Sequence, residues 1–280
     1  MRALFPVLLG FLVLGCASAT PQIDKILGEH NISPNSKLIE NVPFIQQQVG
    51  HCGPATLAMV LNWAGQNISA DNLAKQVFTP GLNGSLQSDM ISASRRLGMM
   101  AVPIEGFNAL LEEIKAGHPV IVFENLSVSW LPQWHYAVVF GYDLPDRKII
   151  MHSGPEAFKR WDMQTFERSW MLGNYWGLVV LPAGQLAATA SELSHGVAAS
   201  ALESIGRSEA AAIAYRSILQ RWSKNLVAQV GLANIAFTRK RYQEAVRLLR
   251  QAAVDHPTSA IVSHNLAVAE VQSRIMKEGL

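Results

Sequence analysis

The chain has 280 residues, of which 49% are hydrophobic and 16% charged, a composition typical of a globular protein and not of a disordered one. Its formal net charge is +2, from 23 basic and 21 acidic residues, and no run of five basic residues occurs, so nothing favours a nucleic-acid partner. This length suits one large domain or two smaller ones.

The N-terminal segment, residues 1–19, is typical of a signal peptide. Arg2 precedes an apolar run from Ala3 to Leu14, which is shorter than the roughly 20 apolar residues that a membrane span needs. The sequence VLGC at 13–16 resembles a bacterial lipobox and predicts that Cys16 becomes the lipidated first residue. The sequence ASA at 17–19 instead suits ordinary signal peptidase, which would release a soluble protein. We favour the lipoprotein, because an apolar run of this kind rarely ends on a cysteine by accident.

A lipidated Cys16 predicts attachment to a membrane and a place in the cell envelope. Ala17 follows the cysteine, so the aspartate that retains lipoproteins at the inner membrane is missing there. By resemblance to Gram-negative lipoproteins, we expect the periplasmic side of the envelope and an anchor in the outer membrane.

The next two regions differ in pattern. Residues 20–40 are polar and irregular and predict a linker, whereas residues 41–183 combine helix and strand patterns. The predicted helices come first, at 53–64, 69–77, 88–97 and 107–116, and the predicted strands follow, at 119–125, 135–143, 147–153 and 176–182. Residues 144–146 read as the turn of a hairpin between the second and third strands. Helices followed by an antiparallel sheet indicate an α+β domain.

Residues 190–280 have no strand pattern and predict an all-α domain. Their best match to a fixed-period repeat is the tetratricopeptide pattern of leucine, small residue, tyrosine, alanine, bulky apolar residue, alanine and proline. The match is carried by Leu232, Ala233, Tyr242, Ala245, Leu249, Ala252 and Pro257. Degenerate matches lie one period of about 34 residues before and after it, and a plain helical hairpin is the alternative. Tetratricopeptide-like helices predict a protein partner.

Cys52 is the only thiol left in the mature polypeptide after cleavage at either site, so it has no internal disulfide partner. One interpretation is a small buried side chain; the other is a nucleophile. Gly53 and Pro54 open the predicted helix directly after it, and a helix N-terminus lowers the pKa of a thiol. The backbone N–H of Cys52 and a side-chain amide from Gln46 or Gln47 then form a candidate oxyanion site.

A cysteine nucleophile also needs a base that is near in space. Of the eight histidines, His135 is our candidate, because it opens a predicted strand and stands between Trp134 and Tyr136. The alternative interpretation of His135 is a structural histidine of the strand.

These residues lie in recognisable sequences. QQQVGHCGPATLAM at 46–59, followed by WHYAVVFGYD at 134–143 and IIMHSG at 149–154, resembles the bacterial peptidases that trim double-glycine leaders from bacteriocins. More closely, the chain resembles the exported, stand-alone branch of that family, which joins a lipoprotein signal and C-terminal tetratricopeptide helices to the peptidase domain. The resemblance implies a papain-like cysteine peptidase fold and a peptide or protein substrate. It assigns the nucleophile to Cys52, the base to His135 and the oxyanion donor to Gln47, with Gln46 as the alternative.

The sequence departs from the family at one position. The resemblance implies an aspartate about seventeen residues after the histidine, where this chain has His152 and Ser153. Ser153 is able to accept the imidazole N–H, but an anion stabilises an imidazolium better than a hydroxyl does. Asp143 cannot replace the aspartate, because it lies eight residues along the strand from His135, roughly 26 Å away.

Three functions are compatible with this sequence. The first is an envelope cysteine peptidase that forms a thioester on Cys52; the second is a peptidase-like module that binds a peptide without cutting it. The third is an assembly lipoprotein in which the helices act and the first domain is a spacer. Cys52, Gln47 and His135 favour the first, and the missing aspartate favours the second. No metal site or cofactor motif is predicted.

Overall fold

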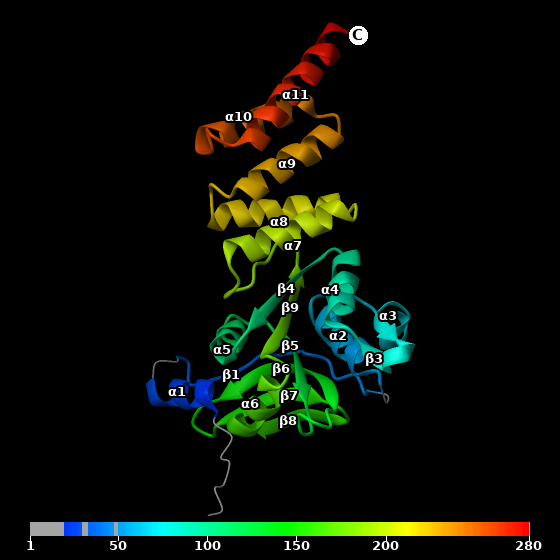
Figure 1. Ribbon diagram of the computed structural model, residues 1–280, viewed down its shortest axis with the longest axis vertical. Coiled ribbons are helices and arrows are strands. Elements are labelled where there is room, and N and C mark those ends of the chain that lie inside the picture. Colours follow the sequence, from blue (N-terminus) through cyan, green and yellow to red (C-terminus); the bar gives the residue numbers. More distant parts are fainter. Residues whose placement is uncertain (1–19, 30–32, 48–49, 280) are drawn as a thin grey trace, which may run out of the picture.

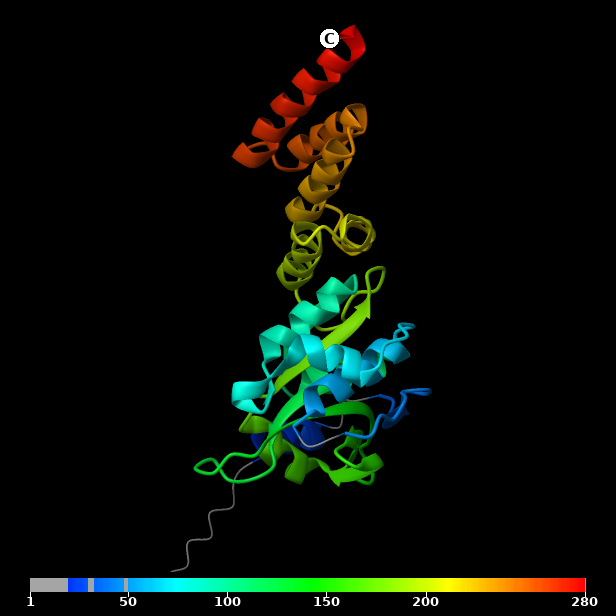
Figure 2. The ribbon, with the colours of Figure 1, turned by 90° about the vertical axis from the view of Figure 1, so that its right-hand side faces the viewer.

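The computed structural model describes residues 20–29, 33–47 and 50–279. Figures 1 and 2 show an elongated molecule, in which a sheet and its covering helices form one end and a stack of helices leads away to the C-terminus. The predicted signal peptide and Cys16 lie outside the described residues. No described helix has both the length and the apolar character that crossing a membrane requires.

An antiparallel sheet of seven strands forms the centre of the first part. Six strands follow the order β4-β9-β5-β6-β7-β8, and β1 pairs with the part of β6 that extends beyond β5. The strands are β1 (Ser36–Leu38), β4 (Met99–Glu105), β5 (Val120–Asn125), β6 (Trp134–Asp143), β7 (Lys148–Ser153), β8 (Glu156–Asp162) and β9 (Trp176–Pro182). A separate two-stranded sheet joins β2 (Phe78–Thr79) and β3 (Gly84–Ser85), with a 3-10 turn at Pro80–Leu82 between them.

Two groups of helices accompany the sheet. The first group is α2 (Cys52–Trp63), α3 (Ala70–Val77) and α4 (Gln87–Arg96); the second is α1 (Pro21–Glu29), α5 (Phe107–Lys115) and α6 (Met163–Met171). The central helix is α2, which contacts β5, β6 and β9 and is buried at every residue from Gly53 to Leu61. The first residue of α2 is therefore held firmly at the edge of the core.

Every helix and strand that we predicted between 41 and 183 is present, with ends within one residue of the prediction. Ser69 caps α3, because its side chain accepts a hydrogen bond from the Asn72 N–H. The hairpin of β6 and β7 forms as well, with a register shift between Val139 and Gly141.

The predicted linker at 20–40 is wrong, because its described residues, 20–29 and 33–40, belong to the folded domain. Ile23 of α1 is fully buried, and the Glu167 carboxylate of α6 accepts the N–H groups of Gln22 and Ile23 at 3.0 and 2.9 Å. The first turn of α1 thus receives the acceptor that a helix N-terminus needs from a residue far along the chain. A polar sequence with one buried isoleucine gives no local sign of such a contact.

Further elements were not predicted: the short strands β1, β2 and β3 with the 3-10 turn, and β4, β8 and α6. β4 and β8 are the two outer strands of the sheet, and β4 contains Pro103, which an edge position tolerates because a proline has no N–H to donate. β8 is largely exposed, so its sequence lacks the apolar alternation of a half-buried strand.

The C-terminal region consists of helices alone, in agreement with the prediction. They are α7 (Glu192–Ser204), α8 (Ser208–Arg221), α9 (Leu226–Thr238), α10 (Tyr242–Asp255) and α11 (Ala260–Glu278). The first, third and fifth helices begin 34 residues apart, at Glu192, Leu226 and Ala260. Close packing depends on small residues: a Cβ at Gly231 would lie 2.3 Å from the Tyr215 ring.

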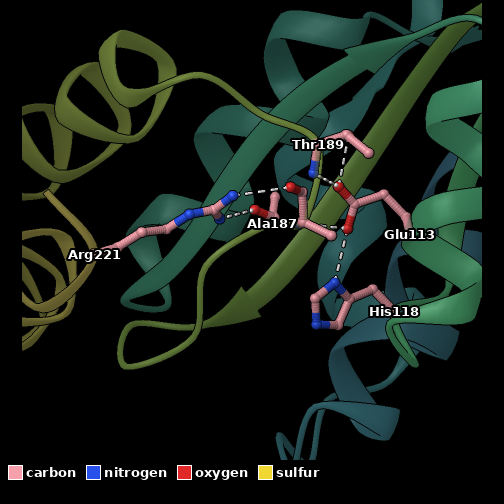
Figure 3. A network of polar contacts seen from close by, with 6 residues as sticks. Glu113, His118, Ala187, Thr189 and Arg221 are labelled. Atoms are coloured by element: carbon pink, nitrogen blue, oxygen red, sulfur yellow. Dashed lines mark hydrogen bonds and ion pairs between the residues drawn. The ribbon is translucent and has the colours of Figure 1, made fainter.

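A polar network joins the helices to the sheet domain (Figure 3). The fully buried Glu113 carboxylate of α5 accepts the backbone N–H groups of Ala188 and Thr189 at 3.0 and 2.7 Å, and it contacts His118 Nδ1 at 2.7 Å. From the other side, Arg221 of α8 donates to the carbonyl groups of Ala187 and Ala188. The segment between β9 and α7 is therefore fixed from both domains.

Candidate active site

A cleft of about 770 Å³ opens beside the N-terminus of α2. It brings together residues from both halves of the sheet domain, including Gln47, Cys52, Ser85, Phe123, Trp134, His135 and Tyr136. Cys52, His135 and Gln47 of the predicted site therefore line one cavity, although 88 residues separate the first from the last in sequence order. At the bottom of the cleft, Gly53 lets α2 approach Ser85 closely, since a Cβ at this position would lie 2.4 Å from Ser85 Oγ.

Cys52 is the first residue of α2 and is partly exposed in the cleft. Burial raises the pKa of its thiol, and the neighbouring backbone groups of Tyr136 and Gly53 oppose this rise only in part. The lowered pKa that we expected from the helix terminus is therefore wrong. Desolvation outweighs the favourable backbone hydrogen bonds at this position, so the neutral thiol is favoured over the thiolate.

His135 lies on β6, at the end where the strand enters the cleft. Its Nε2 is 3.1 Å from Ser153 Oγ, and no hydrogen bond joins the ring to the thiol of Cys52 among the residues that the structure describes. Burial lowers the pKa of His135 to about 4, and the positive charge of Lys159 acts in the same direction. The imidazole is thus neutral near pH 7, with Nδ1 left to take a proton.

The two candidates for the third member have different surroundings. Ser153 lies within hydrogen-bond distance of His135, whereas His152 is fully buried and uses both ring nitrogens elsewhere. His152 Nε2 lies 3.1 Å from the Val42 carbonyl, and its Nδ1 accepts the Phe158 N–H. The geometry brings Ser153 to the imidazole and holds His152 in the core.

The two candidate oxyanion donors also differ. Gln47 lines the cleft, and its Nε2 is buried without a hydrogen-bond partner among the described residues. Gln46 is exposed and lines a separate pocket together with His51 and Asn62. A buried amide donor without an acceptor is costly unless a ligand supplies one, so Gln47 is suited to bind an oxygen atom that arrives with a substrate.

A charged residue that our sequence analysis missed lies beside this site. Glu124 stands directly opposite His135 in the pairing of β5 and β6, and its side chain is fully buried. The available signal was a glutamate directly after the apolar run VIVF at 120–123, in the same strand. In the described part of the chain, no group of three or more His, Cys, Asp or Glu side chains is arranged to hold a metal ion.

Comparison with known proteins places the sheet domain in a family. Residues 39–176 match the model of the Peptidase_C39 like family. Among solved structures, a C39-like peptidase from Bacillus anthracis is 20% identical, with 52% of this chain and 97% of that chain covered and a TM-score of 0.44.

Two further solved structures give similar values. The peptidase domain of Streptococcus ComA, a bifunctional ABC transporter of a quorum-sensing pathway, is 24% identical, with 52% and 98% of the two chains covered and a TM-score of 0.41. A double-glycine-motif protease from an AMS/PCAT transporter, in complex with its leader peptide, is 19% identical, with 52% and 96% covered and a TM-score of 0.39. No curated protein matches the chain. Residues 39–176 thus form a domain of the Peptidase_C39 like family, and the chain joins this domain to a helical C-terminal region.

Proposed function

We propose that the protein is a cysteine peptidase that acts on a peptide bound in the cleft, through a thioester on Cys52. The observation that carries the proposal is the unpaired, buried Nε2 of Gln47 in the cavity that Cys52 and His135 line. A nucleophile, a base and an oxyanion donor are the three groups that acyl transfer needs.

The reaction begins from neutral groups. As Sγ of Cys52 attacks the carbonyl carbon of the peptide, its proton passes to Nδ1 of His135. The Gln47 amide and the Cys52 backbone N–H stabilise the oxyanion. The leaving amine takes the proton from His135 as the C–N bond breaks, and water then hydrolyses the thioester. Because the pKa values of the two groups favour the neutral pair, each turnover includes the energetic cost of forming an imidazolium, and the proposal predicts slow turnover.

The test is labelling by a peptidyl electrophile that reacts with thiols, compared with labelling by iodoacetamide. Wild type should form a covalent adduct at Cys52, Cys52→Ala should form none, and His135→Ala should react much more slowly. Iodoacetamide separates access from activation, because it needs only a reachable thiol. A Cys52 that iodoacetamide alkylates readily while the peptidyl reagent leaves it unmodified would contradict the peptidase.

A specific observation favours a second function, a peptide-binding module. The imidazole has a hydroxyl at the position where the family resemblance implies an anion, and Lys159 makes protonation of His135 still less favourable. Peptide binding with equal affinity to wild type and Cys52→Ala, without any product from the wild type, would select this function.

We extend the proposal to the rest of the chain. The 34-residue spacing of α7, α9 and α11 supports tetratricopeptide-like repeats, whose surface would hold a protein partner. The lipobox at 13–16 supports an envelope lipoprotein of a Gram-negative bacterium, attached through Cys16 with the cleft on the periplasmic side.

A further inference from the structure

Glu124 is a buried carboxyl group that the reaction described above does not use. It is fully buried on β5, and its Oε1 has no hydrogen-bond partner among the described residues. A carboxyl group in this state is costly to a fold unless it has a role or a proton. Burial raises the pKa of Glu124 to about 7, so the group changes charge in the range in which the protein would work.

The register of the sheet places Glu124 next to the base. Glu124 and His135 are direct partners in the antiparallel pair of β5 and β6, so their side chains leave the same face of the sheet with Cβ atoms about 5 Å apart. The rings of the neighbouring pair, Phe123 and Tyr136, contact each other on the opposite face, with centroids 4.7 Å apart, as the alternation of a strand requires.

Ser169 of α6 gives the carboxyl group two stable arrangements. Its Oγ lies 2.9 Å from Glu124 Oε2 and 2.8 Å from the Phe166 carbonyl oxygen, but a hydroxyl has only one proton to donate. A protonated Glu124 donates to Ser169, which then donates to Phe166. An ionised Glu124 accepts the Ser169 proton instead. Both charge states are therefore accommodated without rearrangement of the fold.

The other groups around Glu124 fix the sign of the effect. Lys159 of β8 acts on both Glu124 and His135: it favours the carboxylate and disfavours the imidazolium. β9, the other neighbour of β5, pairs with it through residues 177–179, which are apolar. The charged residues of α6, which also packs on β5, are engaged elsewhere: Glu167 accepts the N–H groups of Gln22 and Ile23, and Arg168 donates to Thr165. Lys159 is thus the cation that acts on Glu124, and His135 is its partner across the strands.

We propose that Glu124 is the anionic partner of His135: when ionised, its carboxylate stabilises, from the neighbouring strand, the imidazolium that forms as His135 takes the proton of Cys52. Ser153 holds Nε2 of the ring, and Glu124 supplies the charge that Ser153 lacks. Glu124 acts through His135 and is a positioning residue. This inference deepens the proposed function and rests on it, since it concerns the base of the cysteine chemistry.

The test follows the His135 ring resonances by NMR as the pH is raised from 5 to 9. In wild type these resonances should show an inflection near pH 7 that reports ionisation of Glu124. Glu124→Gln, which keeps the shape and an acceptor for Ser169, should abolish it. The matched control is Glu167→Gln, which removes another buried carboxylate, one that accepts two backbone N–H groups and lies outside this pair. This control should retain the inflection.

A second readout is the rate of Cys52 labelling by the peptidyl electrophile. In wild type the rate should rise through pH 7, and at pH 8 Glu124→Gln should be about tenfold slower and lack that step. Lys159→Gln should move the step to higher pH, because the cation no longer favours the carboxylate. An inflection without any labelling would support the coupling and overturn the proposed peptidase. Equal labelling of wild type and Glu124→Gln, with no inflection in the ring resonances, would overturn the role of Glu124 and leave the peptidase standing.

Discussion

Burial acts on Cys52 and His135 in opposite directions, and both effects favour the uncharged forms. The pKa of the thiol rises and that of the imidazole falls, so the thiolate–imidazolium pair lies above the neutral pair in free energy. In the proposed reaction, such a site stays unreactive until a substrate binds with a carbonyl group that accepts from Gln47. Reactivity then depends on groups that stabilise charge during the attack, and these are the residues to vary.

Gln47→Ala should slow acylation of Cys52 by a peptidyl electrophile about 10²- to 10³-fold, because one of the two oxyanion donors is lost. The matched control is Gln46→Ala, which changes the preceding, exposed glutamine in a different pocket and should react like wild type. The measurement is the second-order rate constant of inactivation. If Gln46→Ala proves the slower of the two variants, the assignment of Gln47 is wrong.

Ser153→Asp should raise the rate of labelling near pH 7 by tenfold or more. A carboxylate about 3 Å from Nε2 stabilises the imidazolium, so the pKa of His135 rises from about 4 toward its ordinary value. His152→Asp offers the contrast. It places a carboxylate among the rings of Phe44, Phe140 and Phe158 and should lower the free energy of unfolding by at least about 3 kcal/mol without any gain in rate. Labelling rates and thermal unfolding of both variants decide the point.

Among the elements, glycines set how closely the helices approach their neighbours. Gly53 lets α2 reach Ser85 of β3, and Gly231 lets α9 pack on the Tyr215 ring of α8. Tyr215 is in turn fixed by its hydroxyl, which donates to Glu203 of α7 at 2.7 Å. These contacts leave no room for a methyl group, since the ring at Gly231 is held on its far side.

Gly231→Ala should therefore destabilise the helical region by about 1–3 kcal/mol, because the added Cβ overlaps a ring that cannot move away. Gly28→Ala is the control for the intrinsic preference of helices for alanine. It lies in α1 with no atom within 4 Å of the added Cβ, and it should be neutral or stabilising by up to about 1 kcal/mol. Chemical denaturation of both variants measures the difference. Equal stability of Gly231→Ala and wild type would mean that α8 and α9 are packed less tightly than described.

The sequence predicted those elements whose pattern is local and whose surroundings are ordinary. α2, α3 and the strands β5 to β7 have caps, turns or apolar runs that mark their ends. α1 was missed because a carboxylate from α6 caps it, and β4 because Pro103 is unusual in a strand. A contact between residues far apart in the sequence produces no periodic pattern in the sequence around either residue.

In the candidate site, too, local sequence motifs could be predicted and effects of the folded surroundings could not. The positions of Cys52, His135 and Gln47 were named from motifs, but their protonation depends on burial, which only the fold reveals. Glu124 was missed because its importance lies in the register of two strands and not in its sequence neighbours.

For the molecule as a whole, the network around Glu113 links the two regions. Burial alone would raise the pKa of this carboxyl group, but the hydrogen bonds from His118, Thr189 and Ala188 outweigh it and lower the pKa. Because the pKa of Glu113 is lower in the folded state than in the unfolded state, the carboxylate stabilises the fold at pH values above its unfolded-state pKa. This stabilisation is lost as the pH falls through the folded-state pKa.

Glu113→Gln should cost about 1–3 kcal/mol at pH 7, since an amide cannot accept at both positions that receive the backbone N–H groups. The difference from wild type should shrink as the pH falls below the ordinary value of 4.5 and vanish once the wild-type carboxyl is protonated. Thermal unfolding from pH 3 to 8 measures it. A difference that stays constant over this range would show that lost packing, and not lost charge, explains the cost.

Cys16→Ser should release the protein from membranes, because the lipid attached to Cys16 is its proposed anchor. Fractionation of the native host, with wild type in the membrane pellet and the variant in the soluble periplasmic fraction, checks this outcome. The Cys52→Ala variant is the control for loss of a cysteine and should stay with the membrane. Wild type that is already soluble would instead indicate cleavage at 17–19.

The fixed segment between β9 and α7 has a consequence for any chain that contacts both regions. Since Glu113 and Arg221 hold this segment from opposite sides, the cleft and the helical stack keep one separation and one orientation. A polypeptide bound by the helices would then present to the cleft, at a high effective concentration, the one segment that lies at the matching distance along its chain. A polypeptide in which the segment between its two contact regions is too short or too long would lose this advantage. The protein would then select its partners by the length of that segment as well as by their sequence.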